Sequence, residues 1–362
     1  MENKSSKKIE KHLYIFNLST DDNDNVLAFT QDWVIAFKEI VSEVSVFSTW
    51  VGKNSLPPDV QVTQIGGGNL LLRGKAIFRL TKIGLKVIKN RHNAIVFHHM
   101  STRTSTIMGP VFRCFKVNQG LWYSHSRVTR ELLFSEKFMN KLFSSTPGSL
   151  PIKSNKARFT GHGINVDKFP DIPSANRKFA ILSLGRIAKI KRNEILIDAV
   201  AESNRAIKEI HLVGPLGADP AYLQELKLYG SNRGVAVEYL GEVSHSNVAQ
   251  LFLNYSICFT GSPNSVDKSV IEGALCGCFT LASQSFILSQ TTMNDILEQS
   301  GNYFNKSLAV QISILDTLYD RDDLRKMLRN GAAEKNSVQR TTAAIIRAVS
   351  YTHLTLPTIY SV

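Results

Sequence analysis

Short apolar runs rich in β-branched and aromatic residues alternate with longer amphipathic patterns along most of this 362-residue chain. Runs of about four to eight such residues favour strands, whereas apolar residues spaced three or four apart favour helices. Regular alternation of the two is typical of a parallel sheet with helices on both faces. The second half predicts five strands, with a helical pattern after each of the first four: Phe179–Leu184, Glu209–Val213, Val235–Leu240, Ile257–Thr260 and Phe279–Ala282.

The first half has the same rhythm, and its length is that of a second domain, at about 150 residues per domain. Within the segment 163–178, prolines at 170 and 173 interrupt both the helical and the strand spacing of apolar residues. This segment is therefore the predicted joint between the domains. We therefore expect an α/β protein of two doubly wound domains, at 1–165 and 166–349. The six strands predicted in the first half are His12–Leu18, Glu43–Thr49, Val60–Ile65, Ala94–His98, Gly120–Tyr123 and Asn140–Ser144.

Composition narrows the class of protein. Hydrophobic residues make up 43% of the chain and charged residues 20%, which is typical of globular domains and excludes a disordered chain. No run approaches the ~18 apolar residues of a membrane-spanning helix, and the polar start lacks the apolar core of a secretory signal. Cys276 and Cys278 form a lone Cys-x-Cys pair, which predicts neither a disulfide framework nor a zinc site. Residues 350–362 continue no pattern and resemble translated sequencing-adapter sequence, so we expect a non-native tail.

The net charge of +13 is concentrated in the first half of the chain. Residues 1–168 hold 24 Lys and Arg against 12 Asp and Glu, and no acidic residue lies between Asp59 and Glu131. Within this stretch, Arg73–Arg91 combines basic and apolar residues at helical spacing. Two interpretations stay open: the helix lies on an anionic membrane surface, or it shows an ordinary basic face to solvent. Nucleic acid would also suit such a charge, but no RNA-binding signature or helix-turn-helix pattern accompanies it.

Glycine and basic residues follow two of the strands predicted in the second half. Gly185 and Arg186 come directly after one strand, Lys191 precedes the next helix, and Gly214 ends the following strand. Glycine lets a ligand approach the backbone closely, and Arg and Lys both suit a diphosphate. Because ligands of doubly wound sheets bind beyond the carboxyl ends of the strands, we predict an anion site here.

A further helix is predicted to open after Asp267, and its N-terminus would also favour an anion. This helix begins with Lys268 and carries Glu272. The spacing Ser269-x-x-Glu272 matches a capping box, in which Glu272 would only satisfy backbone donors. From the residues alone, both a binding role and a capping role for Glu272 stay open.

In their order and spacing, these motifs resemble the C-terminal domain of glycosyltransferase family 4. The resemblance rests on Gly185-Arg186, Lys191, Gly214 and the run Glu272-Gly273-Ala274-Leu275-Cys276-Gly277. Residues 121–125 and 160–169 are similar to the segments that precede the second domain in that family. The resemblance implies the GT-B fold, in which two Rossmann-like domains face each other across a cleft. It implies transfer of a sugar from a nucleotide diphosphate-sugar to an acceptor hydroxyl with retention, without a metal or a cofactor.

The resemblance also implies roles for individual residues. Arg186 and Lys191 would neutralise the leaving diphosphate beside Gly185 and Gly214, Glu272 would bind the ribose, and His125 would approach the donor sugar. The acceptor would be a glycan or a lipid-linked glycan, in cell-surface polysaccharide or glycolipid synthesis. We expect a cytoplasmic protein, placed peripherally on the inner membrane face by its basic first domain, and we expect no nucleic-acid partner.

Two features depart from the family pattern. Many members carry two glutamates eight residues apart, and the partner of Glu272 here is Asn264. Asp267-Lys268 resembles a subset of the family, and we assign Asn264, Asp267 and Lys268 to the donor site. The segment 17–22 lacks the glycine-rich loop that many members have near the acceptor. The alternatives are a non-catalytic nucleotide-sugar or polyanion binder of the same fold, and an inverting transferase with Asp32 or His125 as general base.

Overall fold

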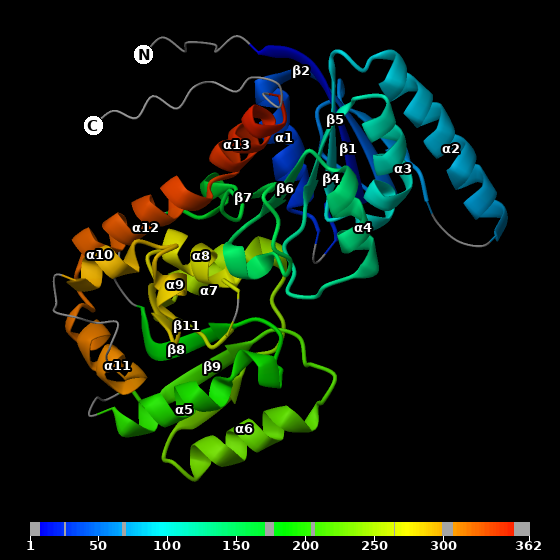
Figure 1. Ribbon diagram of the computed structural model, residues 1–362. Coiled ribbons are helices and arrows are strands. Elements are labelled where there is room, and N and C mark those ends of the chain that lie inside the picture. The colour runs from blue at the N-terminus through cyan, green and yellow to red at the C-terminus, as the bar shows by residue number, and fades with distance from the viewer. Residues whose placement is uncertain are drawn as a thin grey trace. The chain divides into compact units, whose positions relative to one another are not determined.

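The computed structural model describes residues 8–24, 27–66, 70–170, 177–203, 207–263, 265–298 and 307–350 (Figure 1). The chain divides into two compact units, each built on a parallel sheet. The first unit comprises the chain up to Gly163 and again from Val338, and the second unit comprises Ile164–Ser337. The α/β fold class predicted from the sequence is confirmed in both units. Residues 351–362, nearly all of the predicted non-native tail, lie outside the described residues.

The first unit holds a parallel sheet in the order β3-β2-β1-β4-β5-β6-β7. The chain runs outward from β1 to β3, returns to the other side of β1, and runs outward again to β7. The strand order therefore reverses between β1 and β4, as in doubly wound sheets. The strands are β1 (Ile9–Thr20), β2 (Val41–Val51), β3 (Gln61–Gln64), β4 (Ala94–His99), β5 (Asn118–Trp122), β6 (Lys141–Ser144) and β7 (Ala157–Phe159).

Helices cover both faces of this sheet (Figure 1). On one face, α1 and α13 pack around a core that includes Trp33, Phe97 and Ile345. On the other face, α2 and α3 enclose a second core that includes Phe16 and Phe112. Both cores consist of buried apolar side chains, whose removal from water supplies the main driving force for folding. The helices are α1 (Thr30–Ile40), α2 (Leu70–Lys89), α3 (Thr102–Cys114), α4 (Arg130–Phe138) and α13 (Val338–Ser350).

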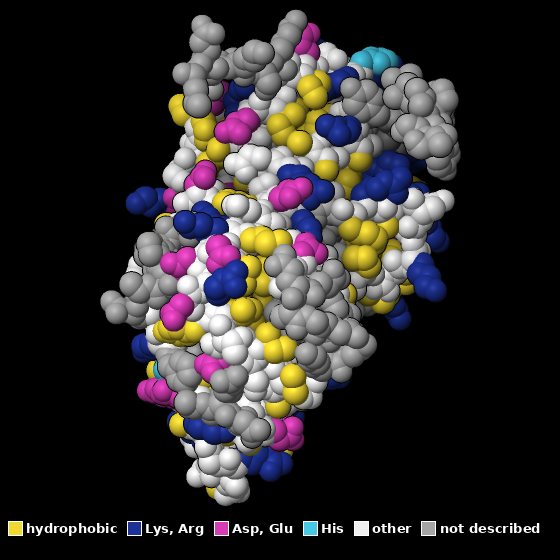
Figure 2. All heavy atoms as spheres, turned by 90° about the vertical axis from the view of Figure 1, so that its left-hand side faces the viewer, with side chains coloured by type: hydrophobic (Ala, Val, Ile, Leu, Met, Phe, Trp, Pro, Cys, Tyr) yellow, Lys and Arg dark blue, Asp and Glu magenta, His cyan; other side chains and the backbone are white. Residues whose placement is uncertain are grey.

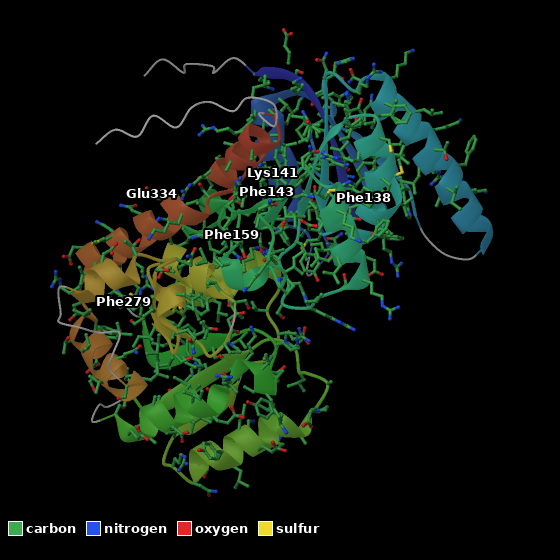
Figure 3. The ribbon with its side chains drawn as sticks, in the orientation of Figure 1. Phe138, Lys141, Phe143, Phe159, Phe279 and Glu334 are labelled. Carbon is green, nitrogen blue, oxygen red and sulfur yellow. The ribbon has the colours of Figure 1, made fainter. Side chains whose placement is uncertain are left out.

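Helix α13 lies in the first unit, whereas the sequence analysis placed residues up to 349 in the second domain. Its buried side chains Ile345, Ile346 and Val349 belong to the core of the first unit. Val349 lies against the strand residues Gly120 and Phe143, the second of which is labelled in Figure 3. The chain therefore crosses back after Asn336, and the apolar face of α13 completes the layer begun by α1.

The second unit holds a parallel sheet in the order β10-β9-β8-β11-β12, and its strand order reverses between β8 and β11. Its strands are β8 (Lys178–Leu184), β9 (Glu209–Val213), β10 (Ala236–Tyr239), β11 (Tyr255–Thr260) and β12 (Phe279–Ala282). Its helices are α5 (Asn193–Glu202), α6 (Ala221–Ser231), α7 (Val248–Leu253), α8 (Lys268–Leu275), α9 (Ser285–Leu288), α10 (Met293–Glu298), α11 (Leu308–Thr317) and α12 (Asp322–Asn336). Across the described ranges of both units, no helix combines the length and the apolar character of a membrane-spanning segment.

Candidate functional site

A small pocket lies at the carboxyl ends of β8 and β11, where the strand order of the second unit reverses. Neighbouring chain segments leave in opposite directions at such a reversal, so the sheet edge opens there for a ligand. The sequence-predicted residues Gly185, Arg186, Lys191 and Asp267 all line this pocket. The other lining residues are Ser183, Leu184, Phe259, Thr260 and Gly261.

Gly185 and Gly214 bring two strand ends unusually close together. Gly185 has a φ of +146° and Gly214 a φ of +134°, both in the region that L side chains rarely adopt. A Cβ atom on Gly214 would lie only 2.2 Å from the carbonyl oxygen of Gly185. At the end of β8, Gly185 therefore leaves the backbone without a side chain to cover it, and the Nζ atom of Lys191 lies close by.

Gly214→Ala is expected to destabilise the protein by about 3 kcal/mol or more, since backbone strain and a clash add together. The new Cβ would meet backbone atoms of Gly185, which cannot rotate away as a side chain can. Urea denaturation at neutral pH measures this loss. Gly234→Ala is the matched control, because Gly234 also has a positive φ of +70°, while no described residue beyond its chain neighbours lies within 4 Å of the added Cβ. The control should lose only about 1–2 kcal/mol, and equal losses in both variants would contradict the close approach.

Two basic side chains, those of Arg186 and Lys191, lie next to the Gly185 backbone at the end of β8. Arg186 is exposed, and no hydrogen bond or ion pair joins its side chain to a described residue. Lys191 ends the short 3-10 turn Lys189–Lys191, and its Nζ donates to Asp267 Oδ1 at 2.6 Å and to Ser262 Oγ at 3.2 Å. An ammonium group has three donors, so contacts with the described residues leave Lys191 one donor for a ligand.

Asp267 is held by three residues of this site. Its Oδ2 accepts hydrogen bonds from Thr260 Oγ1 at 2.6 Å and Ser262 Oγ at 2.8 Å, while Oδ1 pairs with Lys191. Burial opposes ionisation of this carboxyl, but the charge and the hydrogen bond of Lys191, with the two hydroxyls, outweigh it and lower the pKa of Asp267. Asp267 precedes α8 as its N-cap residue without a side-chain cap, so its carboxylate serves to position Lys191 instead.

Glu272 lies on α8 with 4% of its surface exposed. Its Oε1 lies 3.1 Å from Lys268 Nζ and 3.7 Å from His245 Nε2, yet it accepts no hydrogen bond from the described residues. Ser269 does not form the capping box that its spacing allows, because its hydroxyl donates to the carbonyl of Leu184 at 3.0 Å. This bond ties the first turn of α8 to the end of β8. Glu272 therefore forms an ion pair with Lys268 and does not cap the helix.

The sequence analysis missed part of this group, and one of its residues cannot be placed. Thr260, Ser262 and His245 carried no motif, although each contacts Asp267, Lys191, Lys268 or Glu272. Only the Ser/Gly/Pro/Asn composition of the loop after β11 could have drawn attention to Ser262. Asn264, assigned to the donor site from the sequence, lies outside the described residues.

His125 belongs to the first unit, where it follows β5. It is exposed, and its Nδ1 accepts a hydrogen bond from the backbone N–H of Arg127 at 3.0 Å. This ring is therefore available to solvent and not packed into the core beside Trp122. The other proposed general base, Asp32, lies in α1 and is buried.

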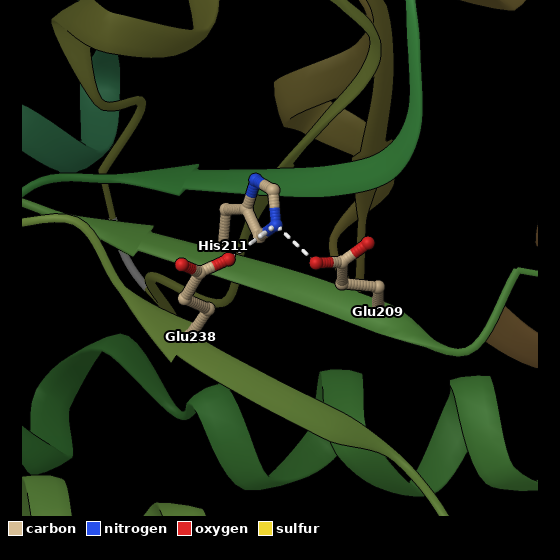
Figure 4. Close-up of side chains that lie close together, drawn as sticks. All are labelled: Glu209, His211 and Glu238. Carbon is tan, nitrogen blue, oxygen red and sulfur yellow. Dashed lines mark hydrogen bonds and ion pairs between the residues drawn. The ribbon is translucent and has the colours of Figure 1, made fainter.

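A separate group of ionisable residues lies on β9 and β10 (Figure 4). The buried His211 has its Nε2 2.7 Å from Glu209 Oε1 and 3.2 Å from Glu238 Oε2, and its Nδ1 lies 2.5 Å from Tyr255 Oη. One imidazole and two carboxylates are a donor set that divalent cations accept. Here both ring nitrogens already have partners within the chain, so the group joins β9, β10 and β11 as a polar network.

The sequence matches no protein-family model and no curated protein, whereas solved structures give clear matches. HepE of Anabaena in complex with UDP matches with a TM-score of 0.64 and 13% identity, over 94% of this chain and 99% of HepE. A glycosyltransferase from Rickettsia africae matches with a TM-score of 0.64 and 13% identity, over 96% of this chain and 100% of that one. The lipopolysaccharide outer core galactosyltransferase WaaB matches with a TM-score of 0.60 and 10% identity, over 94% and 99%. The chain thus shares the two-unit α/β architecture of GT-B glycosyltransferases.

Proposed function

We propose that this protein is a retaining glycosyltransferase of the family 4 type, which needs no metal or cofactor and uses a nucleotide diphosphate-sugar as donor. The observation that carries the proposal is the pocket at the reversal between β8 and β11, which Arg186 and Lys191 border. A guanidinium fork and an ammonium group with an unused donor suit the two phosphates of a nucleoside diphosphate. The comparisons support this choice of ligand, since HepE is also solved in complex with UDP-glucose.

In the proposed reaction, the bond between the anomeric carbon and the diphosphate oxygen breaks while the acceptor oxygen bonds to that carbon on the same face. The acceptor proton passes to the departing phosphate oxygen, so charge and atoms balance. Negative charge grows on the diphosphate as it leaves, and Arg186 and Lys191 are the groups that neutralise it. His125 of the first unit approaches the hydroxyls of the donor sugar.

Glu272 is proposed to bind the ribose. Glu272 Oε1 is ion-paired with the Lys268 ammonium at 3.1 Å but accepts no well-aligned hydrogen bond from the described residues, so a ribose hydroxyl would supply a directed donor beside this ion pair. The oxygen concerned is Glu272 Oε1, which lies on the helix that Ser269 ties to the end of β8. Asn264, Asp267 and Lys268 are proposed to complete the donor site.

For the acceptor, we propose a glycan or a lipid-linked glycan in the synthesis of a cell-surface polysaccharide or glycolipid, on the cytoplasmic side of the membrane. The support is the fold shared with WaaB, which acts on the lipopolysaccharide outer core.

We expect one of the nucleoside diphosphates UDP, GDP and ADP to raise the melting temperature of the full chain by a few degrees. CMP, a monophosphate, is tested for comparison. At about 100 times the dissociation constant, a ligand stabilises a protein by roughly 2.7 kcal/mol. The shift should persist in EDTA, because the two basic side chains and not a metal hold the diphosphate. Nucleoside diphosphate release from the matching sugar donor, and the anomeric configuration of the product by NMR, then test transfer and retention.

Arg186→Ala should abolish the shift, because the variant lacks the guanidinium proposed to bind the diphosphate. No described residue bonds to that side chain, so the change should leave the fold intact. Lys227→Ala on α6 removes another exposed basic residue from the same unit and should leave the shift unchanged. A shift that needs a divalent cation would contradict the proposal, as would a product of inverted configuration. A shift without any turnover would favour a nucleotide-sugar binder of the same fold.

A further inference from the structure

Helix α2 presents two different apolar faces, only one of which the fold uses. Ile83 and Val87 are buried in the core beneath the helix, with Leu80 and Ile88 packed against it. On the remaining surface, Ile77, Phe78 and Leu85 are 67%, 61% and 64% exposed. Phe78 and Leu85 are seven residues apart, which places them on one face, two turns from each other. This outward face buries nothing within the described part of the protein.

Basic side chains surround the outward face. Lys75, Lys82 and Lys89 recur at helical spacing beside Phe78 and Leu85, and all three are exposed. The Lys82 ammonium lies over the Phe78 ring, 4.6 Å from its centre. None of these lysines forms an ion pair with a described acidic residue, and the chain carries no acidic residue between Asp59 and Glu131.

The neighbouring helix α3 also carries exposed apolar residues. Gly84 of α2 lies against Met108 of α3, so the two helices pack side by side (Figure 1). Ile107 and Val111 of α3, and Phe115 directly after it, are exposed at a spacing of four residues, in a segment that also carries exposed Arg113 and Lys116. By contrast, Figure 2 shows another face of the molecule, on which acidic side chains lie among the basic ones.

We propose that the outward face of α2 docks on an anionic lipid bilayer. An apolar stripe flanked by lysines suits the boundary between acyl chains and headgroups, since Phe78 and Leu85 leave water while the lysines reach the phosphates. A nucleic acid would use the charge but would leave both apolar side chains in water. The inference goes beyond the proposed transfer reaction and does not depend on it.

Co-sedimentation of the full chain with two kinds of vesicle tests the proposal. One kind contains phosphatidylcholine alone, and the other contains three parts phosphatidylcholine to one part phosphatidylglycerol. Binding should be at least tenfold tighter to the anionic vesicles. The triple variant Lys75→Gln, Lys82→Gln, Lys89→Gln should bind roughly 100-fold more weakly, because each basic residue near an anionic leaflet strengthens binding about fivefold. Phe78→Ser with Leu85→Ser should weaken binding by at least about tenfold.

The control variant combines Lys227→Gln with Leu228→Ser, on α6 of the second unit. Leu228 is 65% exposed and follows an exposed lysine, so the change matches the others in kind. This control should bind vesicles as the wild type does, and circular dichroism should show that every variant remains folded. Equal binding to both kinds of vesicle, or none to either, would overturn the proposal. Unchanged binding after loss of Phe78 and Leu85, with full displacement by duplex DNA, would overturn it in favour of a polyanion surface.

Discussion

Lys191→Met is expected to lower the rate of sugar transfer by about 10²–10³-fold, the effect of removing a preorganised group that stabilises developing negative charge. It should also lower the stability of the second unit by about 3 kcal/mol, because Asp267 keeps its charge and loses its ionic partner. The side chains of Lys191 and Asp267 are 22% and 17% exposed, so solvent replaces only part of what is lost. Donor turnover and urea denaturation measure the two effects separately.

A double-mutant cycle separates the catalytic effect from the structural one. The variant Lys191→Met with Asp267→Asn no longer buries an unpaired charge, so it should recover most of the lost stability without recovering activity. Lys189→Met is the matched control, since Lys189 is 65% exposed, pairs with two surface carboxylates and lies 5.8 Å from the centre of the Tyr222 ring. It should change stability and turnover little. Recovery of activity in the double variant would show that Lys191 acts only by neutralising Asp267, and not on the diphosphate.

The strands and most of the helices follow from the sequence because each is a local pattern. The five strands predicted in the second half lie within two residues of β8 to β12 at every end. Three-residue β7 was missed, since so short an edge strand has no period to detect. The return of α13 to the first unit was also missed. Its apolar stripe predicts that the helix packs on a sheet, but does not indicate which of the two sheets.

The candidate site was predictable where its residues adjoin strand ends, as Gly185, Arg186 and Gly214 do. Chain connectivity alone brings such residues to one edge of a parallel sheet. The contacts of Asp267 were not predictable, because Lys191 lies 76 positions away along the chain and Thr260 and Ser262 are common loop residues. His245 was missed for the same reason, since it meets Lys268 and Glu272 only in the folded unit.

Acidification from pH 7 to pH 5 is expected to destabilise the first unit by about 4 kcal/mol through His98 and His99. Both rings are buried at the end of β4, and no described residue forms a hydrogen bond with either Nε2. Burial lowers the pKa of both to about 3, although a contact with Gln119 opposes this for His98. In the unfolded chain each pKa returns to about 6.5, so below that pH the unfolded state binds more protons. Each histidine therefore lowers the free energy of unfolding by about 2 kcal/mol between pH 7 and pH 5.

Urea denaturation at several pH values, followed by a probe of the first unit, measures this slope. The double variant His98→Gln with His99→Gln should be less stable at pH 7, because Trp33 loses its contact with the His99 ring. The centres of these two rings lie 4.6 Å apart. The slope of the double variant between pH 7 and pH 5 should nevertheless fall well below that of the wild type. His92→Gln replaces an exposed histidine that precedes the start of β4 and should keep the wild-type slope. The stability that the two buried rings contribute is complete above pH 6.5 and is lost progressively toward pH 3, so an unchanged slope in the double variant would mean that both rings accept protons in the folded protein.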